Sequence, residues 1–204
     1  MIISVDHIAM SSLDIKRDVQ NAQLKGYSCL FCEKLVNLKT KQQFLSKWQD
    51  LHTLAFCENK NGYNIELLNH GQITKNKGYI EFIKDNEVTI KTPDTLKSII
   101  LWKLLGFQKI QNNRLVFSSF FAKTPLYINL VEIKDTPKRQ LDDFGCNCMG
   151  FITSSVTNEH AKLKEICSKI TDIEELCVND NDMKIFFAQY NSNEIIEVIE
   201  IIKK

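Results

Sequence analysis

The 204-residue sequence has no excess of charge of either sign. Its 26 basic and 25 acidic residues give a formal net charge of +1, and the basic residues are dispersed among the acidic ones. Nucleic-acid-binding proteins gather lysine and arginine on one face, because the phosphate backbone supplies most of the affinity. The composition therefore argues against a nucleic-acid partner.

Long apolar runs are also missing. No stretch reaches the roughly 20 residues that a membrane-spanning helix needs. The segment 1–6 reads as a strand, without the charged start and long apolar middle of a signal peptide. We therefore expect no membrane partner and a cytoplasmic location. Hydrophobic residues still make up 44% of the chain, enough to bury a sizeable core.

Seven cysteines, an odd number, fit reduced thiols better than a disulfide framework. The pairs in Cys29–Cys32 and Cys146–Cys148 raise the alternative of structural zinc. Zinc knuckles place such pairs on glycine-rich tight turns, whereas Leu30 and Phe31 are not turn residues. We therefore interpret these cysteines as small buried hydrophobic residues.

Apolar periodicity and turn residues divide the chain into about three units, each reading strand, helix and three strands. The predicted units span residues 1–70, 86–133 and 146–204, with polar linkers at 71–85 and 134–145. The first unit carries an insertion near 36–50, which we predict to be a short covering helix because Phe44, Leu45 and Trp48 have helical spacing. The fold class is therefore predicted to be α+β with tandem βαβββ modules.

Helix boundaries repeat between the units. Asp14 and Asp94 are good N-caps, and Gly26 and Gly106 are placed as C′ glycines. In the third unit, we expect the residues at 157–158 to cap a helix that extends to about residue 169.

Polar residues recur within the apolar strands at intervals of roughly 65 residues. Glu66, Asn129 and Glu197 occupy the same place in three similar strands. A carboxylate among β-branched residues is costly to bury without a cation or donor. Each glutamate therefore indicates either a ligand or a strand whose face is exposed to water. His7, in the middle of the first predicted strand, is open to both a core and a ligand interpretation.

Four short motifs together resemble the vicinal oxygen chelate superfamily, which is also called the glyoxalase/bleomycin-resistance/dioxygenase superfamily. The motifs are Val5–Met10 followed by Asp14, Leu104–Phe107, Asn61–Leu67 and Asn191–Glu197. The resemblance covers nearly the whole chain. It implies βαβββ modules that pair so that mixed sheets curl into a cup, with a divalent metal held by the first and fourth strands of each module.

The resemblance also implies which residues could be ligands. The first-strand positions are His7, Glu87 and Gly150, and the last-strand positions are Glu66, Asn129 and Glu197. Only the first module keeps a histidine with a glutamate, and two protein ligands rarely hold a divalent ion. The site therefore depends on which modules pair.

Three pairings remain open at this stage. If the first and second modules form the cup, Glu87 and Asn129 join His7 and Glu66 in an oxygen-rich set suited to Mn, Fe or Mg. If the first and third modules pair, Glu197 joins His7 and Glu66 in a set close to a facial triad. The second and third modules together would make a poor metal site.

Two functions follow from the resemblance. In one, the protein is a lyase, an isomerase or epimerase, or a dioxygenase that uses Fe, Mn, Ni, Zn or Mg, with Glu66 or Glu197 moving a proton. In the other, it is a metal-free protein that binds a small molecule between aromatic walls. An odd number of modules leaves one apolar sheet face uncovered, which predicts either a covering helix or a homodimer.

Overall fold

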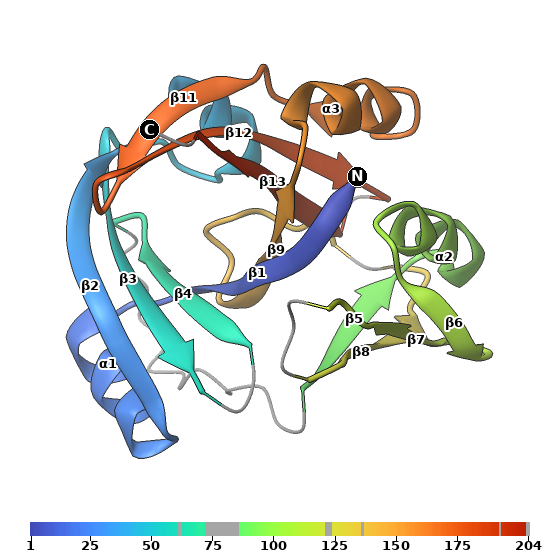
Figure 1. The fold of residues 1–204 in the computed structure, drawn as a ribbon, viewed down its shortest axis with the longest axis horizontal. Helices are drawn as coiled ribbons and strands as arrows, with labels where there is room; N and C mark the ends of the chain where they lie inside the picture. The colour runs from blue at the N-terminus through green and yellow to red at the C-terminus, as the bar shows by residue number, and fades with distance from the viewer. Residues whose placement is uncertain (61–62, 72–85, 121–123, 136, 192, 203–204) are drawn as a thin grey trace.

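The computed structural model describes residues 1–60, 63–71, 86–120, 124–135, 137–191 and 193–202 (Figure 1). Asn61, Gly62 and Ser192 of the predicted motifs lie outside the described residues, as does most of the first linker. No helix among the described residues is long and apolar enough to cross a membrane.

The α+β class is confirmed, and each of three successive parts of the chain begins with a strand and a helix. The first two continue with three strands, as predicted, whereas the third continues with four because it has the additional two-residue strand β10. The elements of the first are β1 (Ile2–Ser11), α1 (Ile15–Leu24), β2 (Tyr27–Val36), η1 (Lys39–Phe44), β3 (Leu51–Asn59) and β4 (Asn64–Asn69). Those of the second are β5 (Glu87–Thr92), α2 (Thr95–Leu104), β6 (Gln108–Gln111), β7 (Arg114–Phe117) and β8 (Leu126–Glu132). Those of the third are β9 (Gly145–Thr153), α3 (Val156–Lys164), β10 (Lys169–Ile170), β11 (Glu174–Val178), β12 (Asn181–Tyr190) and β13 (Glu194–Ile201).

The helix caps follow the sequence in two units and differ in the third. The side chains of Asp14 and Asp94 accept hydrogen bonds from backbone amides in the first turns of α1 and α2. In the third unit Ser155 is the N-cap, and α3 ends at Lys164. The prediction of a cap at 157–158 and a longer helix is wrong there, because Ser155 Oγ already accepts from the Asn158 amide.

The insertion differs from the predicted helix. It forms the 3₁₀ helix η1, and the chain is extended again at Leu45. Phe44 and Leu45 are nevertheless buried, in a cluster with side chains from β3, β4, β12 and β13. The segment therefore covers the sheet as predicted, but its helix is shorter and ends at Phe44, where the predicted helical spacing begins.

The first and third units join into one curled sheet. Its strand order is β10-β12-β13-β9-β1-β4-β3-β2, with β11 also paired to β12. The join is the antiparallel pair β1/β9, while β1/β4 and β13/β9 are parallel. Of the three pairings left open by the sequence, the structure adopts the one between the first and third modules.

The middle unit keeps the same strand order in a separate sheet, β5-β8-β7-β6. It lies beside the cup, with α2 next to it (Figure 1). Its Trp102 and Phe107 rings approach Phe151 of β9, with ring centroids 6.4 Å apart in both cases. The middle unit thus covers the convex side of the β1/β9 join, and the concave side is left for a site. A homodimer stays a prediction.

Candidate metal centre

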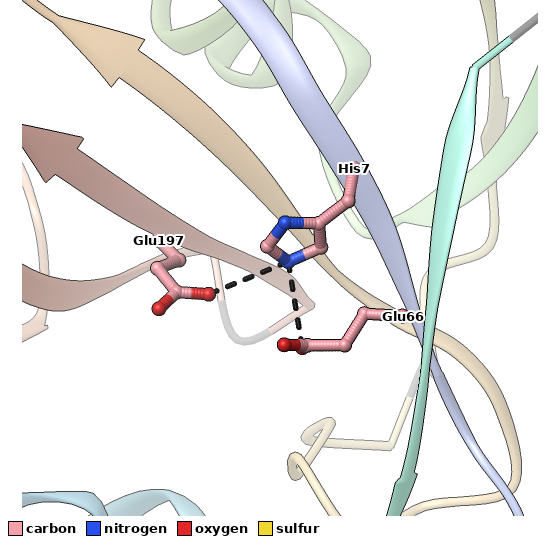
Figure 2. Close-up of side chains that lie close together, drawn as sticks. All are labelled: His7, Glu66 and Glu197. Atoms are coloured by element: carbon pink, nitrogen blue, oxygen red, sulfur yellow. Dashed lines mark ion pairs between the residues drawn. The ribbon is translucent and has the colours of Figure 1, made fainter. Parts of the chain in front are cut away.

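Three of the predicted site residues come together on the concave face of the cup. His7 lies in the middle of β1, Glu66 in β4 and Glu197 in β13, and their side chains converge (Figure 2). Alternation places them there, because the next residues along each strand, such as Ile8 and Val198, belong to the core cluster on the other face. The paired isoleucines of β13 are explained by the same geometry, since both faces of that strand are covered.

The three groups are close and buried. His7 Nε2 lies 3.4 Å from Glu66 Oε2 and 3.4 Å from Glu197 Oε2. The side chains are 3%, 12% and 11% exposed, respectively. One donor atom from each residue falls within 4.8 Å of the other two.

Gly150 occupies the fourth position of this symmetric arrangement. It pairs with His7 across β1/β9 and with Glu197 across β13/β9. A Cβ atom on Gly150 would lie 2.4 Å from His7 Cε1, closer than non-bonded carbon atoms approach. The absence of a side chain at position 150 therefore gives the imidazole the space in which it lies.

Asp6 orients the histidine, a role that the sequence analysis missed. Asp6 Oδ2 lies 2.8 Å from His7 Nδ1. An ionised carboxylate can only accept, so Nδ1 carries a hydrogen and Nε2 faces the two glutamates. Adjacent strand residues normally point to opposite faces, but the β1/β9 register shifts between Val5 and His7. This irregularity lets Asp6 reach its neighbour.

Burial and the charges of these side chains shift one another's pKa values. Burial alone would lower the pKa of His7, but the carboxylates of Glu66, Asp6 and Glu197 outweigh it and hold that pKa well above its ordinary value. Burial raises the pKa of Glu66; His7 opposes this and Glu197 adds to it. The thiol of Cys148 nearby also has a pKa well above its usual range, first through burial and then through the two glutamates.

The structure does not bring Glu87 or Asn129 to this group. Both lie on the separate sheet, in β5 and β8. Glu87 Oε2 accepts from Arg114 Nη2 at 2.7 Å, and its other oxygen accepts from the Asn129 amide. The Glu87 side chain is 36% exposed, so this carboxylate has its cation and faces solvent.

A cavity of about 540 Å³ opens beside the three groups, a size common for small-molecule sites. Its walls are mainly apolar. The Phe31 and Phe56 rings stack with centroids 5.6 Å apart, and Phe56 meets the His7 ring edge-to-face. Two of the few polar groups in its lining are Lys41 and His52, which the sequence analysis did not single out as site residues.

The chain's own geometry fits a divalent ion. Two atoms each about 2.1 Å from one ion are about 3.0–3.4 Å apart at octahedral or tetrahedral angles, and His7 Nε2 meets both glutamate oxygens at such a distance. Nε2 is buried without a hydrogen-bond partner among the described residues, although a buried polar atom normally has one. The Asp6 contact matches the outer carboxylate that commonly orients a metal-bound histidine.

The sequence matches no protein-family model and no curated protein. Among solved structures, the chain is similar to a putative dioxygenase from Bacillus subtilis, at 8% identity and a TM-score of 0.42, over 98% of this chain and 64% of the other. Glyoxalase I from Zea mays is similar at 14% identity and a TM-score of 0.39, over 98% and 68%. A glyoxalase/bleomycin resistance protein/dioxygenase from Alicyclobacillus acidocaldarius is similar at 14% identity and a TM-score of 0.37, over 64% and 96%. The chain thus spans about two thirds of the first two proteins.

Proposed function

We propose that the protein binds a divalent metal through His7, Glu66 and Glu197 and uses it in a reaction on a small oxygenated substrate. The reaction class is that of a lyase, an isomerase or epimerase, or a dioxygenase. The observation that carries the proposal is the buried Nε2 of His7, which lies 3.4 Å from an oxygen of each glutamate, without the geometry of a hydrogen bond to either, at the wall of a cavity. A cation is the one simple species that all three groups would bind together.

The ligand set favours hard or borderline ions. One nitrogen and two carboxylates suit Mn, Fe or Mg, and Ni or Zn also accept such ligands. A bound ion would act as a Lewis acid toward two adjacent oxygens of the substrate.

The surrounding residues supply the remaining functions. Asp6 holds His7 in the tautomer that presents Nε2. Glu66, whose pKa is raised by burial, is suited to take a proton from the substrate and return it, and Glu197 lies on the opposite side of the imidazole for the same task. The stacked Phe31 and Phe56 rings keep water from this side of the site.

The raised pKa of His7 favours a second function, that of a metal-free binding protein. A protonated His7 would itself neutralise part of the charge on Glu66 and Glu197, and the apolar walls would hold a ligand by burial alone. In that case the three groups are a structural ion cluster, and the cavity carries the function.

Metal analysis separates the two functions. Protein purified without chelator should hold about one divalent ion per chain. Glu66→Gln and Glu197→Gln should each weaken metal affinity by at least about 100-fold, because loss of even an outer-shell partner costs about 10–100-fold. Glu87→Gln, at the position of the middle unit that corresponds to His7, is a carboxylate-to-amide control outside the site and should bind as the wild type does. Protein that neither retains nor takes up a divalent ion would contradict the metal-dependent function and favour the metal-free binding protein.

A further inference from the structure

A second set of buried polar side chains faces the same cup, away from the three ligand candidates. Lys41 of η1 is 8% exposed, His52 of β3 is 5% exposed, and His70, just after β4, is 1% exposed. Lys41 and His52 line the cavity directly, and His70 stacks against His52 with ring centroids 5.4 Å apart. Burying a lysine in an apolar cavity is costly unless its charge is compensated.

These side chains have no acceptor within the described part of the chain. No carboxylate there forms an ion pair with the Lys41 ammonium, which lies 4.5 Å from the centroid of the Phe187 ring. His52 Nδ1 and both ring nitrogens of His70 are buried without a hydrogen-bond partner. Burial first, and then Lys41, lower the pKa of His52 to about 3 and that of His70 to about 4, so both imidazoles are neutral N–H donors near pH 7.

Asp142, which acts electrostatically on His70, binds the chain after η1. Asp142 accepts from the backbone amide of Ser46 at 2.9 Å and 3.0 Å and from that of Lys47 at 3.3 Å. It thereby fixes the loop that follows η1. Lys41 and the two histidines therefore form a site with several donors and a positive charge, to which the described residues supply no hydrogen-bond acceptor.

Strand register fixes where this site lies relative to the ligand candidates. Phe56 pairs with Glu66 and Leu54 with Leu68, and His52 and His70 each lie two residues further along. Four residues of strand span about 13 Å. The concave face thus presents, in order, the carboxylate of Glu66, the apolar side chains of Leu54 and Leu68, and the two histidines. Lys41 lies close enough to act electrostatically on both ends.

We infer that the cavity takes an amphipathic anion, whose carboxylate or phosphate group is bound by Lys41 and His52 and whose apolar body lies over Leu54. The substrate class of the proposed enzyme is then an organic acid or phosphate ester with its reacting oxygens at the far end from the anionic group. Only the placement of those oxygens rests on the proposed function. The anion site itself requires no metal.

The test uses protein freed of metal with chelator, so that it succeeds or fails independently of metal binding. Calorimetric titration compares octanoate, octyl phosphate and 1-octanol, which share one apolar chain. Wild type should bind at least one of the two anions about tenfold or more tighter than 1-octanol, as expected for a charge-assisted hydrogen bond. The tighter of the two anions identifies the headgroup.

Matched variants locate the effect. Lys41→Met should abolish the preference for the anion and keep the affinity for 1-octanol, while Lys39→Met, on the exposed side of the same helix, should change neither. Equal binding of anions and alcohol by wild type, or an unchanged preference in Lys41→Met, would overturn the inference.

Imidazole resonances of the wild type provide a measurement that needs no variant. Those of His52 should shift with the anion and not with 1-octanol, and a His52 signal that responds identically to both would also overturn the inference.

Discussion

The cup and the middle unit repeat one strand order but hold their carboxylates in opposite environments. In the cup, Glu66 and Glu197 are about one-tenth exposed and face a histidine. In the middle unit, Glu87 occupies the first-strand position that corresponds to His7, is 36% exposed and pairs with Arg114 at 2.7 Å. The concave face of the cup is enclosed by a second module and by η1, whereas the polar face of the middle sheet meets water.

The difference shows that enclosure, more than residue type, makes a candidate site. A solvent-exposed carboxylate paired with arginine contributes little to stability, and its charge is already compensated. Two carboxylates in a low-dielectric cup interact strongly with any cation that reaches them. The middle unit covers the back of the β1/β9 join, so its role is to support the sheet that carries the site.

The largest expected difference between the two regions is the loss of stability when the basic side chain that faces the carboxylates is removed. His7→Ala leaves Glu66 and Glu197 buried without a partner, and in metal-free protein it should lower the free energy of unfolding by about 3–5 kcal/mol. Arg114→Ala in the middle unit should cost less than about 1 kcal/mol. Urea unfolding in the presence of chelator measures both, and equal losses would show that the two sites are not distinguished by burial.

The contact between the two regions should depend on pH. Glu194, at the start of β13, accepts a hydrogen bond from Ser98 of α2, and burial raises its pKa to about 7. The folded protein therefore keeps a proton that the unfolded chain releases above about pH 4.5. This stability is present at low pH and is lost as the pH rises through 7, by up to about 3 kcal/mol.

Glu194→Gln removes this titration. Between pH 5 and pH 8.5, unfolding free energies of the wild type should fall by about 3 kcal/mol more than those of the variant. Parallel pH profiles would mean that the carboxyl is not held neutral at the contact.

The close approach of Gly150 to His7 predicts a smaller effect, with no counterpart in the middle unit. Gly150→Ala introduces a methyl group 2.4 Å from His7 Cε1 and should cost about 1–3 kcal/mol of stability, together with a loss of metal affinity. In the double variant with His7→Ala the added cost should disappear, because the clashing ring is gone. If the stability losses of the two single variants are additive, the cost of Gly150→Ala does not come from its contact with His7.

The smallest expected effect concerns the orientation of the histidine. Asp6→Asn keeps the size of the side chain but removes its charge, and it should weaken metal binding by about tenfold while leaving the fold intact. Isothermal titration with Mn²⁺ measures this loss. An unchanged affinity would show that Asp6 does not tune His7.

Much of the fold could be predicted because its signals are local. Apolar alternation, the Asp14 and Asp94 caps and the two C′ glycines define elements within a few residues of themselves, and two of three helix starts were predicted correctly. The start of α3 was wrong because Ser155, Thr157 and Asn158 are all suitable caps, and only the path of the preceding strand selects among them.

The site was predicted only as a set of alternatives. His7, Glu66 and Glu197 were candidates from sequence, but their meeting depends on β1 pairing with β9, and strand alternation within a module does not say which modules join. Asp6 was missed because alternation assigns it to the other face, and only the irregular β1/β9 register reverses this. Lys41 was missed because the insertion that carries it has no equivalent in the other modules.

The parallel pairing of β13 with β9 has a consequence for how the centre is assembled. His7 and Glu66 are in place once the first module has formed, but Glu197 belongs to the last strand of the fold. Synthesis therefore makes His7 and Glu66 before the middle unit and Glu197 after it. A chain interrupted before β13 would lack Glu197, so under the proposed function it would bind the ion poorly, and metal binding would report that the polypeptide has folded through β13.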